Sequence, residues 1–184
     1  MKEIHLPADP EALRSLTAGE EVLLSGQVLT MRDSALARLE GLVRKGGKPP
    51  FDLTGQVVFY AGPAPPAAGR PAGAIGPTTS ARMDHLLELL IDAGAAATLG
   101  KGPRSSDAVA LHKRHGLVYF AAVGGLAALY GGMVEAIQPV AWEDLGPEAV
   151  YRVTLNGFPA VVAIDASGRD HHSSQFASYR RNQS

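Results

Sequence analysis

Three basic side chains lie in polar or glycine-rich turns, where they could bind an anion. Arg82 follows the turn 76–79 and opens a helical pattern, Lys101 is flanked by two glycines, and Arg32 precedes another helical pattern. A helix N-terminus carries unpaired N–H groups and a partial positive charge, so a cation in the first turn is unfavourable for the helix alone. An anionic ligand between these positive charges would remove the conflict. The glycines beside Lys101 would let a ligand approach the backbone closely.

Each turn also has an ordinary structural interpretation, which spacing alone does not exclude. A threonine cap followed by a solvated arginine is common, and Asp33 beside Arg32 suits a simple capping turn. Neither a Walker A motif nor a Gly-x-Gly-x-x-Gly fingerprint is present, so nucleotide phosphate binding is only weakly supported. No Gly-x-Ser-x-Gly elbow occurs either, which leaves a hydrolase triad unsupported.

The six histidines form no pattern typical of a metal site. His112 and His115 share one face of a predicted helix, but no third ligand is evident near them. His171-His172 falls in a polar tail. We therefore expect no metal ligands from this chain.

Composition narrows the class of protein. The chain has 184 residues, 17 Lys and Arg against 18 Asp and Glu, a formal net charge of -1 and no cysteine. This length suits one domain, and the balanced charge argues against non-specific nucleic-acid binding. No apolar run approaches the roughly 20 residues of a membrane span, and residues 1–16 lack the apolar region of a signal peptide. We expect a soluble, cytoplasmic protein that binds neither nucleic acid nor membrane, without disulfides or thiolate ligands.

Apolar runs and helical spacings predict alternating strands and helices. We expect strands at 21–29, 56–60, 95–99, 117–123 and 137–142, and a hairpin of 151–155 and 160–165 around Asn156-Gly157. Helices are expected from a Thr30 cap to Gly46, over 80–93, from Ser105 or Ser106 to His115, and near 126–135. Residues 61–76 are predicted to form a loop within one domain. The pattern indicates a single α/β domain with a mixed sheet over residues 1–168, followed by a polar, frayed tail at 169–184.

Several motifs together resemble the β subunit, or C-terminal domain, of class I fumarate hydratases and the related L-tartrate dehydratase β subunit. They are Arg32-Asp33-Ser34-Ala35, GPTTSARMD at 76–84, Gly100-Lys101-Gly102, Tyr119-Phe120 with Gly124-Gly125, and WEDLG at 142–146. The resemblance spans roughly Leu6 to Gly168. It implies a swivelling β/β/α fold. It also implies a [4Fe–4S] cluster whose cysteines come from another subunit or domain.

The resemblance implies roles for individual residues. Substrate binding would fall to Arg32, Arg82, Lys101 and Gly76, and either Thr78 or Thr79 would be the catalytic base. Reversible hydration of a dicarboxylate does need cations for two carboxylates, a base for a weakly acidic C–H, and a Lewis acid for the hydroxyl. An ordinary threonine hydroxyl is a very poor base, so that role depends on the resemblance alone.

The implied enzyme is an iron–sulfur hydro-lyase that interconverts fumarate and malate. This chain would be its β subunit, active only with a cysteine-bearing α subunit in a heterodimer or an (αβ)2 assembly. The family often has histidine four residues after the first arginine, where this chain has Leu36 on an apolar stripe. Two alternatives therefore stay open. One is a β subunit for L-tartrate or another hydroxy-diacid, and the other is a non-catalytic anion-binding module of the same fold.

Overall fold

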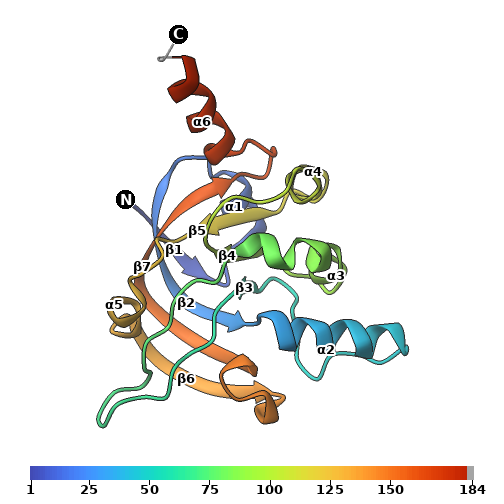
Figure 1. The fold of residues 1–184 in the computed structure, drawn as a ribbon, viewed down its shortest axis with the longest axis vertical. Coiled ribbons are helices and arrows are strands. Elements are labelled where there is room, and N and C mark those ends of the chain that lie inside the picture. Colours follow the sequence, from blue (N-terminus) through green and yellow to red (C-terminus); the bar gives the residue numbers. More distant parts are fainter. Residues whose placement is uncertain (182–184) are drawn as a thin grey trace.

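The structure is a computed structural model that describes residues 1–181 (Figure 1). Its strands are β1 (Lys2–Leu6), β2 (Glu21–Thr30), β3 (Val57–Phe59), β4 (Ala97–Gly100), β5 (Val118–Ala121), β6 (Val134–Ala141) and β7 (Val150–Ile164). Its helices are α1 (Pro10–Arg14), α2 (Asp33–Arg44), α3 (Leu87–Asp92), α4 (Ser106–His115), α5 (Ala127–Gly131) and α6 (His171–Arg181), with 3-10 helices η1 (Ser80–Leu86) and η2 (Glu143–Glu148). The predicted single α/β domain with a mixed sheet is confirmed. None of the described helices is long and apolar enough to cross a membrane.

The seven-stranded sheet closes on itself. Its order is β1-β2-β3-β4-β5-β7-β6, and β7 pairs antiparallel with β2 as well as with β5. Strands β1 to β5 run parallel to one another, whereas β6 pairs antiparallel with β7. The closed ring encloses one apolar core, and helices α2, α3 and α4 cover the outside of the parallel strands (Figure 1). The layers are therefore sheet, sheet and helix.

The side chains of β3 alternate between two apolar cores, one inside the ring and one between the sheet and helix α2. Val57 and Phe59 point into the ring, where Phe59 packs edge-on against Phe158 with ring centroids 5.5 Å apart. Val58 instead packs under α2 with Leu36, which is fully buried. Successive side chains of a strand point to opposite faces, so a buried strand between two layers is apolar throughout. Leu36 is thus a core residue, as its place on the apolar stripe predicted.

The predicted hairpin around Asn156-Gly157 is wrong. Residues 150–164 form one strand of 15 residues, and β2 pairs with it along most of its length. Gly157 has a φ of +64°, which lets the strand bend without turning back, and its N–H donates to Ser25 Oγ at 2.9 Å. The Asn-Gly signal therefore marks an irregularity in a continuous strand.

Other predicted elements differ in their ends. Thr30 is not the cap of α2; it ends β2, and its buried Oγ1 accepts a hydrogen bond from Tyr151 N at 3.1 Å. The helix expected over 80–93 is a 3-10 helix followed by a short α-helix. The helix near 126–135 is shorter than expected. Helix α4 begins after Ser105 and ends at the left-handed Gly116, as predicted.

Four elements were not predicted from the sequence, and the 3-10 helix η2 is one of them. Strand β1 extends the sheet beside β2, and α1 follows it. Helix α6 occupies 171–181, where we expected a frayed polar tail, and Figure 1 shows that it projects from one end of the domain. The division at residue 168 stays a prediction, and residues 182–184 lie outside the described part.

One histidine of helix α4 is fully buried beside β5. His112 has Nδ1 3.0 Å from the Leu117 carbonyl oxygen, so Nδ1 carries the proton and donates it. Its Nε2 has no hydrogen-bond partner among the described residues. Burial, and then the charge of Arg104, lower the pKa of His112 from 6.5 to about 4. This imidazole is therefore neutral in the folded protein at neutral pH.

The free energy of unfolding is expected to fall by about 2 kcal/mol between pH 7 and pH 5 because of His112. The pKa of the folded state lies below the unfolded value, so the unfolded chain takes up the proton first as the pH falls from 6.5 towards 4. Urea denaturation of the wild type and His112→Asn at several pH values measures this loss. The asparagine amide keeps a donor for Leu117 but does not titrate. An equally steep loss of stability in both proteins would contradict the assignment.

Candidate active site

The predicted functional residues meet at the carboxyl edge of the parallel strands. Arg32 follows the end of β2, Lys101 follows β4, and Gly124-Gly125 lies after β5. After β3, Ala61 forms a β-bridge with Pro77 of the threonine turn. Carboxyl ends of parallel strands share one edge, which is where open α/β sheets bind ligands. The parallel pairing therefore brings these distant turns together.

Backbone hydrogen bonds hold the threonine turn against the lysine loop. Thr78 N donates to the Tyr60 carbonyl at 2.7 Å, Lys101 N donates to Thr78 O at 3.1 Å, and Ser80 N donates to Lys101 O at 3.0 Å. A Cβ on Gly100 would lie 2.0 Å from Ser80 Oγ, so only glycine allows this approach. Thr78 and Thr79 are thus fixed beside Lys101, with Thr79 exposed and Thr78 half-buried.

Lys101 is a cation without a carboxylate partner among the described residues. Its side chain is half-buried and its stem runs along Gly124, where a Cβ would lie 3.2 Å from Lys101 Cδ. No ion pair or side-chain hydrogen bond involves its ammonium group in the part of the chain that the structure describes. A charge held in place without a partner can bind an anion.

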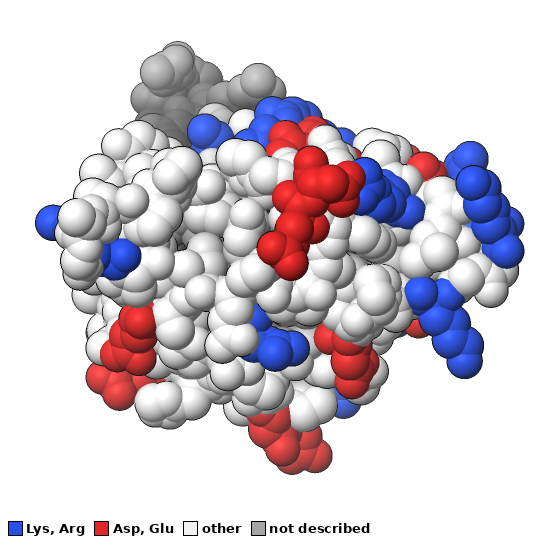
Figure 2. Space-filling view, turned by 90° about the horizontal axis from the view of Figure 1, so that it is seen from below, with Lys and Arg blue, Asp and Glu red and all other residues white. Residues whose placement is uncertain are grey.

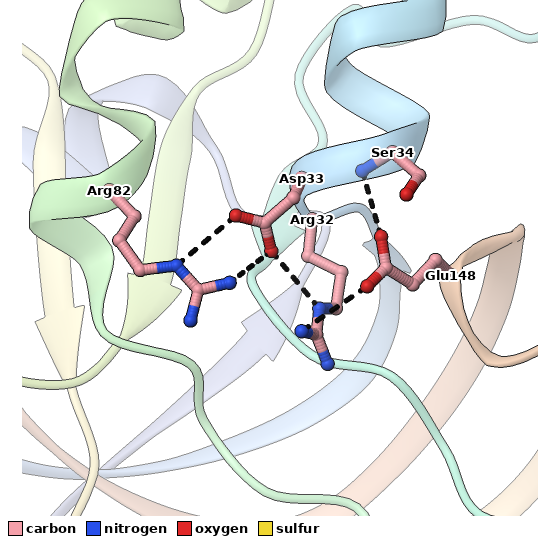
Figure 3. A network of polar contacts seen from close by, with 5 residues as sticks. All are labelled: Arg32, Asp33, Ser34, Arg82 and Glu148. Carbon is pink, nitrogen blue, oxygen red and sulfur yellow. Dashed lines mark hydrogen bonds and ion pairs between the residues drawn. The ribbon is translucent and has the colours of Figure 1, made fainter.

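The two arginines meet on one carboxylate (Figure 3). Asp33 Oδ1 accepts from Arg82 Nε at 3.1 Å, and Oδ2 accepts from Arg82 Nη2 and from Arg32 Nε, the latter at 3.3 Å. Burial alone would raise the pKa of Asp33, but the hydrogen bonds and charge of Arg82, a backbone hydrogen bond and the Arg32 hydrogen bond together hold that pKa below its ordinary value. Asp33 is therefore ionised and links α2 to η1.

A second carboxylate, from η2, completes the network. Glu148 Oε1 lies 3.2 Å from Arg32 Nη2, and Oε2 accepts a hydrogen bond from Ser34 N at 2.8 Å. The Ser34 hydrogen bond is the main cause of a lowered pKa for Glu148, with Arg32 adding to it. Because Arg32 offers no side-chain cap to α2, Glu148 satisfies an N–H that the helix start leaves unpaired.

The guanidinium groups of Arg32 and Arg82 each have one nitrogen that binds no described residue. The Nη1 atoms of Arg32 and Arg82 take part in none of the interactions within the described residues, and in the view of Figure 3 both free ends point downward. Arginine presents donors in a fixed fork that suits a carboxylate. The two free Nη1 groups can together bind one carboxylate of a small diacid.

The structure changes part of the sequence argument. Arg82 lies in the first turn of the 3-10 helix η1, and Asp33 compensates its charge within the chain. An external anion is therefore not needed to explain that cation. Gly76 packs against α5, since its Cβ would lie 2.9 Å from Ala127 Cβ; no described contact places it at a ligand. Glu148 was missed, because it lies 114 residues from Ser34 and no local pattern marks it.

The donor set of this chain does not fit an iron–sulfur cluster. The sequence has no cysteine, and in the described part no three histidine, aspartate or glutamate side chains gather closely enough to hold a metal ion. Figure 2 shows one face on which basic and acidic side chains alternate with uncharged areas.

The fold and these residues define an α/β domain that gathers cations at the carboxyl edge of its sheet. The chain belongs to the family described as fumarase C-terminus, whose model matches residues 1–175. It is 32% identical over 169 residues to fumarate hydratase 2 of Leishmania major, covering 91% of this chain and 30% of that protein. It is 36% identical over 149 residues to the anaerobic class I fumarate hydratase of Escherichia coli K12, covering 80% and 27%.

A third relative is much shorter than the two fumarate hydratases, so this chain covers most of it. The putative L(+)-tartrate dehydratase subunit beta of Methanocaldococcus jannaschii is 35% identical over 162 residues, which cover 85% of this chain and 83% of that subunit. This chain thus spans about a third of the length of the fumarate hydratases above (30% and 27%), but most of a separate β subunit.

Proposed function

We propose that this chain is the β component of a hydro-lyase that interconverts fumarate and malate, active only with an α component. Lys101 carries the argument: this cation has no ion-pair partner among residues 1–181, and it is held against a threonine turn at the same strand edge as two arginines. Family membership supports the reaction class. The cytoplasm is the proposed location.

The residues of this chain would bind and orient the diacid. The free Nη1 groups of Arg32 and Arg82 take one carboxylate, and Lys101 takes the other. Binding at both ends fixes the carbon atoms that exchange a proton and a hydroxyl. Positive charge beside a carboxylate stabilises the enediolate that develops when the neighbouring C–H loses its proton. Thr78 or Thr79 receives that proton, a role that rests on the family resemblance.

A partner would supply what this chain lacks. The sequence has no cysteine for the [4Fe–4S] cluster that the resemblance implies, so we propose that the α component ligates it. The name of one relative supports two components, since the putative tartrate dehydratase subunit beta is one subunit of an enzyme. A heterodimer or an (αβ)2 assembly is the proposed form.

Anaerobic assays of the chain alone and of its co-purified complex are expected to separate the components. The complex should hydrate fumarate and contain iron, whereas the chain alone should do neither. Purification from the native cell, followed by iron analysis and mass spectrometry, identifies the partner. Robust fumarate hydration by the chain alone would reject the two-component proposal.

A β subunit for L-tartrate or another hydroxy-diacid is the second candidate, favoured by the tartrate dehydratase relative. The same cations would serve any such dianion, so fumarate, malate and L-tartrate should be assayed side by side. A non-catalytic anion-binding module is the third. Leu36 favoured it, but this side chain is 0% exposed and packs in the core. Absence of a neighbouring reading frame with three well-separated cysteines would support the module.

A further inference from the structure

A buried arginine lies directly behind the threonine turn. The Arg104 side chain is 0% exposed and forms an ion pair with Asp84. Its guanidinium carbon lies 5.0 Å from the ring centroid of Tyr119 and 5.6 Å from that of Tyr60. Among the described residues its Nη2 atom has no hydrogen-bond partner. Burying a charge with an incomplete set of partners costs free energy, so stability alone does not account for this arrangement.

Hydrogen bonds connect this group of buried side chains to the threonine turn and to the lysine loop. The Tyr119 hydroxyl lies 2.8 Å from the Gly102 carbonyl oxygen and 3.0 Å from Ser80 Oγ. Asp84 accepts a hydrogen bond from Ser105 N at 2.7 Å. The Tyr119 hydroxyl therefore joins Ser80, which follows the two threonines, to Gly102, which follows Lys101.

Proton counting gives these bonds a direction. A phenol has one proton and a carbonyl oxygen can only accept, so Tyr119 donates to Gly102. The hydroxyl of Ser80 then donates to the oxygen of Tyr119. Stacking on Arg104 holds the ring that carries this link.

We propose that Tyr119, held by the Arg104–Asp84 pair, is a positioning residue that sets the separation between the threonine turn and Lys101. This inference rests on the proposed function for its effect on rate. If the Tyr119 hydroxyl is removed, this side-chain link is lost. Two backbone hydrogen bonds, from Lys101 N to Thr78 O and from Ser80 N to Lys101 O, then still hold the turn to the loop. A displacement of about 1 Å in a reacting geometry can cost on the order of 10²-fold in rate.

Tyr119→Phe and Tyr60→Phe form a matched pair. Both changes remove a hydroxyl from a buried ring beside Arg104, but the Tyr60 hydroxyl makes no hydrogen bond among the described residues. In the assembled enzyme, Tyr119→Phe should lower kcat roughly 10- to 100-fold. Its KM should rise by a smaller factor than kcat falls, because Asp33 and Glu148 hold the arginines independently of Tyr119. Tyr60→Phe should leave both constants within about twofold of the wild type.

Hydrogen exchange of the full chain supplies a second readout. The amides of Ser80 and Lys101 should exchange faster in Tyr119→Phe than in Tyr60→Phe or the wild type, whereas the Leu117 amide should not change. An unchanged kcat for Tyr119→Phe, or equal losses in both variants, would overturn the inference. If the wild-type complex acts on no diacid, the proposed function fails by itself. The exchange comparison then decides the inference, and equal exchange in the three proteins overturns it.

Discussion

Replacing Arg82 with alanine is expected to lower kcat/KM of the assembled enzyme by about 10²- to 10³-fold while leaving the fold nearly intact. The change removes the free Nη1 group that binds a substrate carboxylate in the proposed site, and hydrogen bonds between two charged groups are stronger than those between neutral ones. Stability should change little, because the Arg82 side chain is 49% exposed and exposed ion pairs contribute at most about 1 kcal/mol.

Arg44→Ala is the matched control for this experiment. Arg44 also forms an exposed ion pair, with Glu40 on the same helix, but at the far end of α2 from the network. Its removal should leave kcat/KM unchanged. Steady-state kinetics of both variants, with circular dichroism to confirm folding, give the comparison. An unaltered kcat/KM for Arg82→Ala would remove this residue from the proposed site.

Leu87→Ala is expected to lower the free energy of unfolding by roughly 2–5 kcal/mol. Leu87 is 0% exposed and packs with Ala108 and Leu117 between α3, α4 and the start of β5. Deleting a buried side chain removes its transfer free energy and leaves a cavity that the surroundings fill only partly. Urea denaturation at neutral pH measures the loss.

Leu129→Ala supplies the control for this stability measurement. Leu129 is 56% exposed on α5, so the same deletion leaves no cavity there. Its free energy of unfolding should stay within about 0.5 kcal/mol of the wild type. A change that small for Leu87→Ala would mean that this helix face is not part of the core.

Local patterns in the sequence predicted most of the fold. The runs at β3 and β5 are continuously apolar, as buried strands between two layers must be. The cap at Ser105 and the left-handed Gly116 are local signals, and both hold in the structure. The hairpin failed because its Asn-Gly signal is also local, whereas the path of β7 is decided by pairing with β2 more than a hundred residues earlier.

The candidate site was only partly predictable. The three cations could be named, because basic residues in glycine-rich turns stand out. Their placement at one edge follows from parallel pairing, which a list of strands does not specify. Asp33 was interpreted only as a cap, although it joins both arginines. Glu148 reaches α2 from a distant 3-10 helix, so no spacing rule could find it.

Strand β7, which closes the ring, also determines when this domain can fold during synthesis. Because β7 pairs with both β2 and β5, the ring cannot close until its residues 150–164 have been synthesised. Until then the apolar interior lacks Phe158, the partner of Phe59. Contacts between such distant segments make folding slow and leave a nascent chain prone to aggregation. On the ribosome, the first 149 residues must therefore wait in an open form for the last strand.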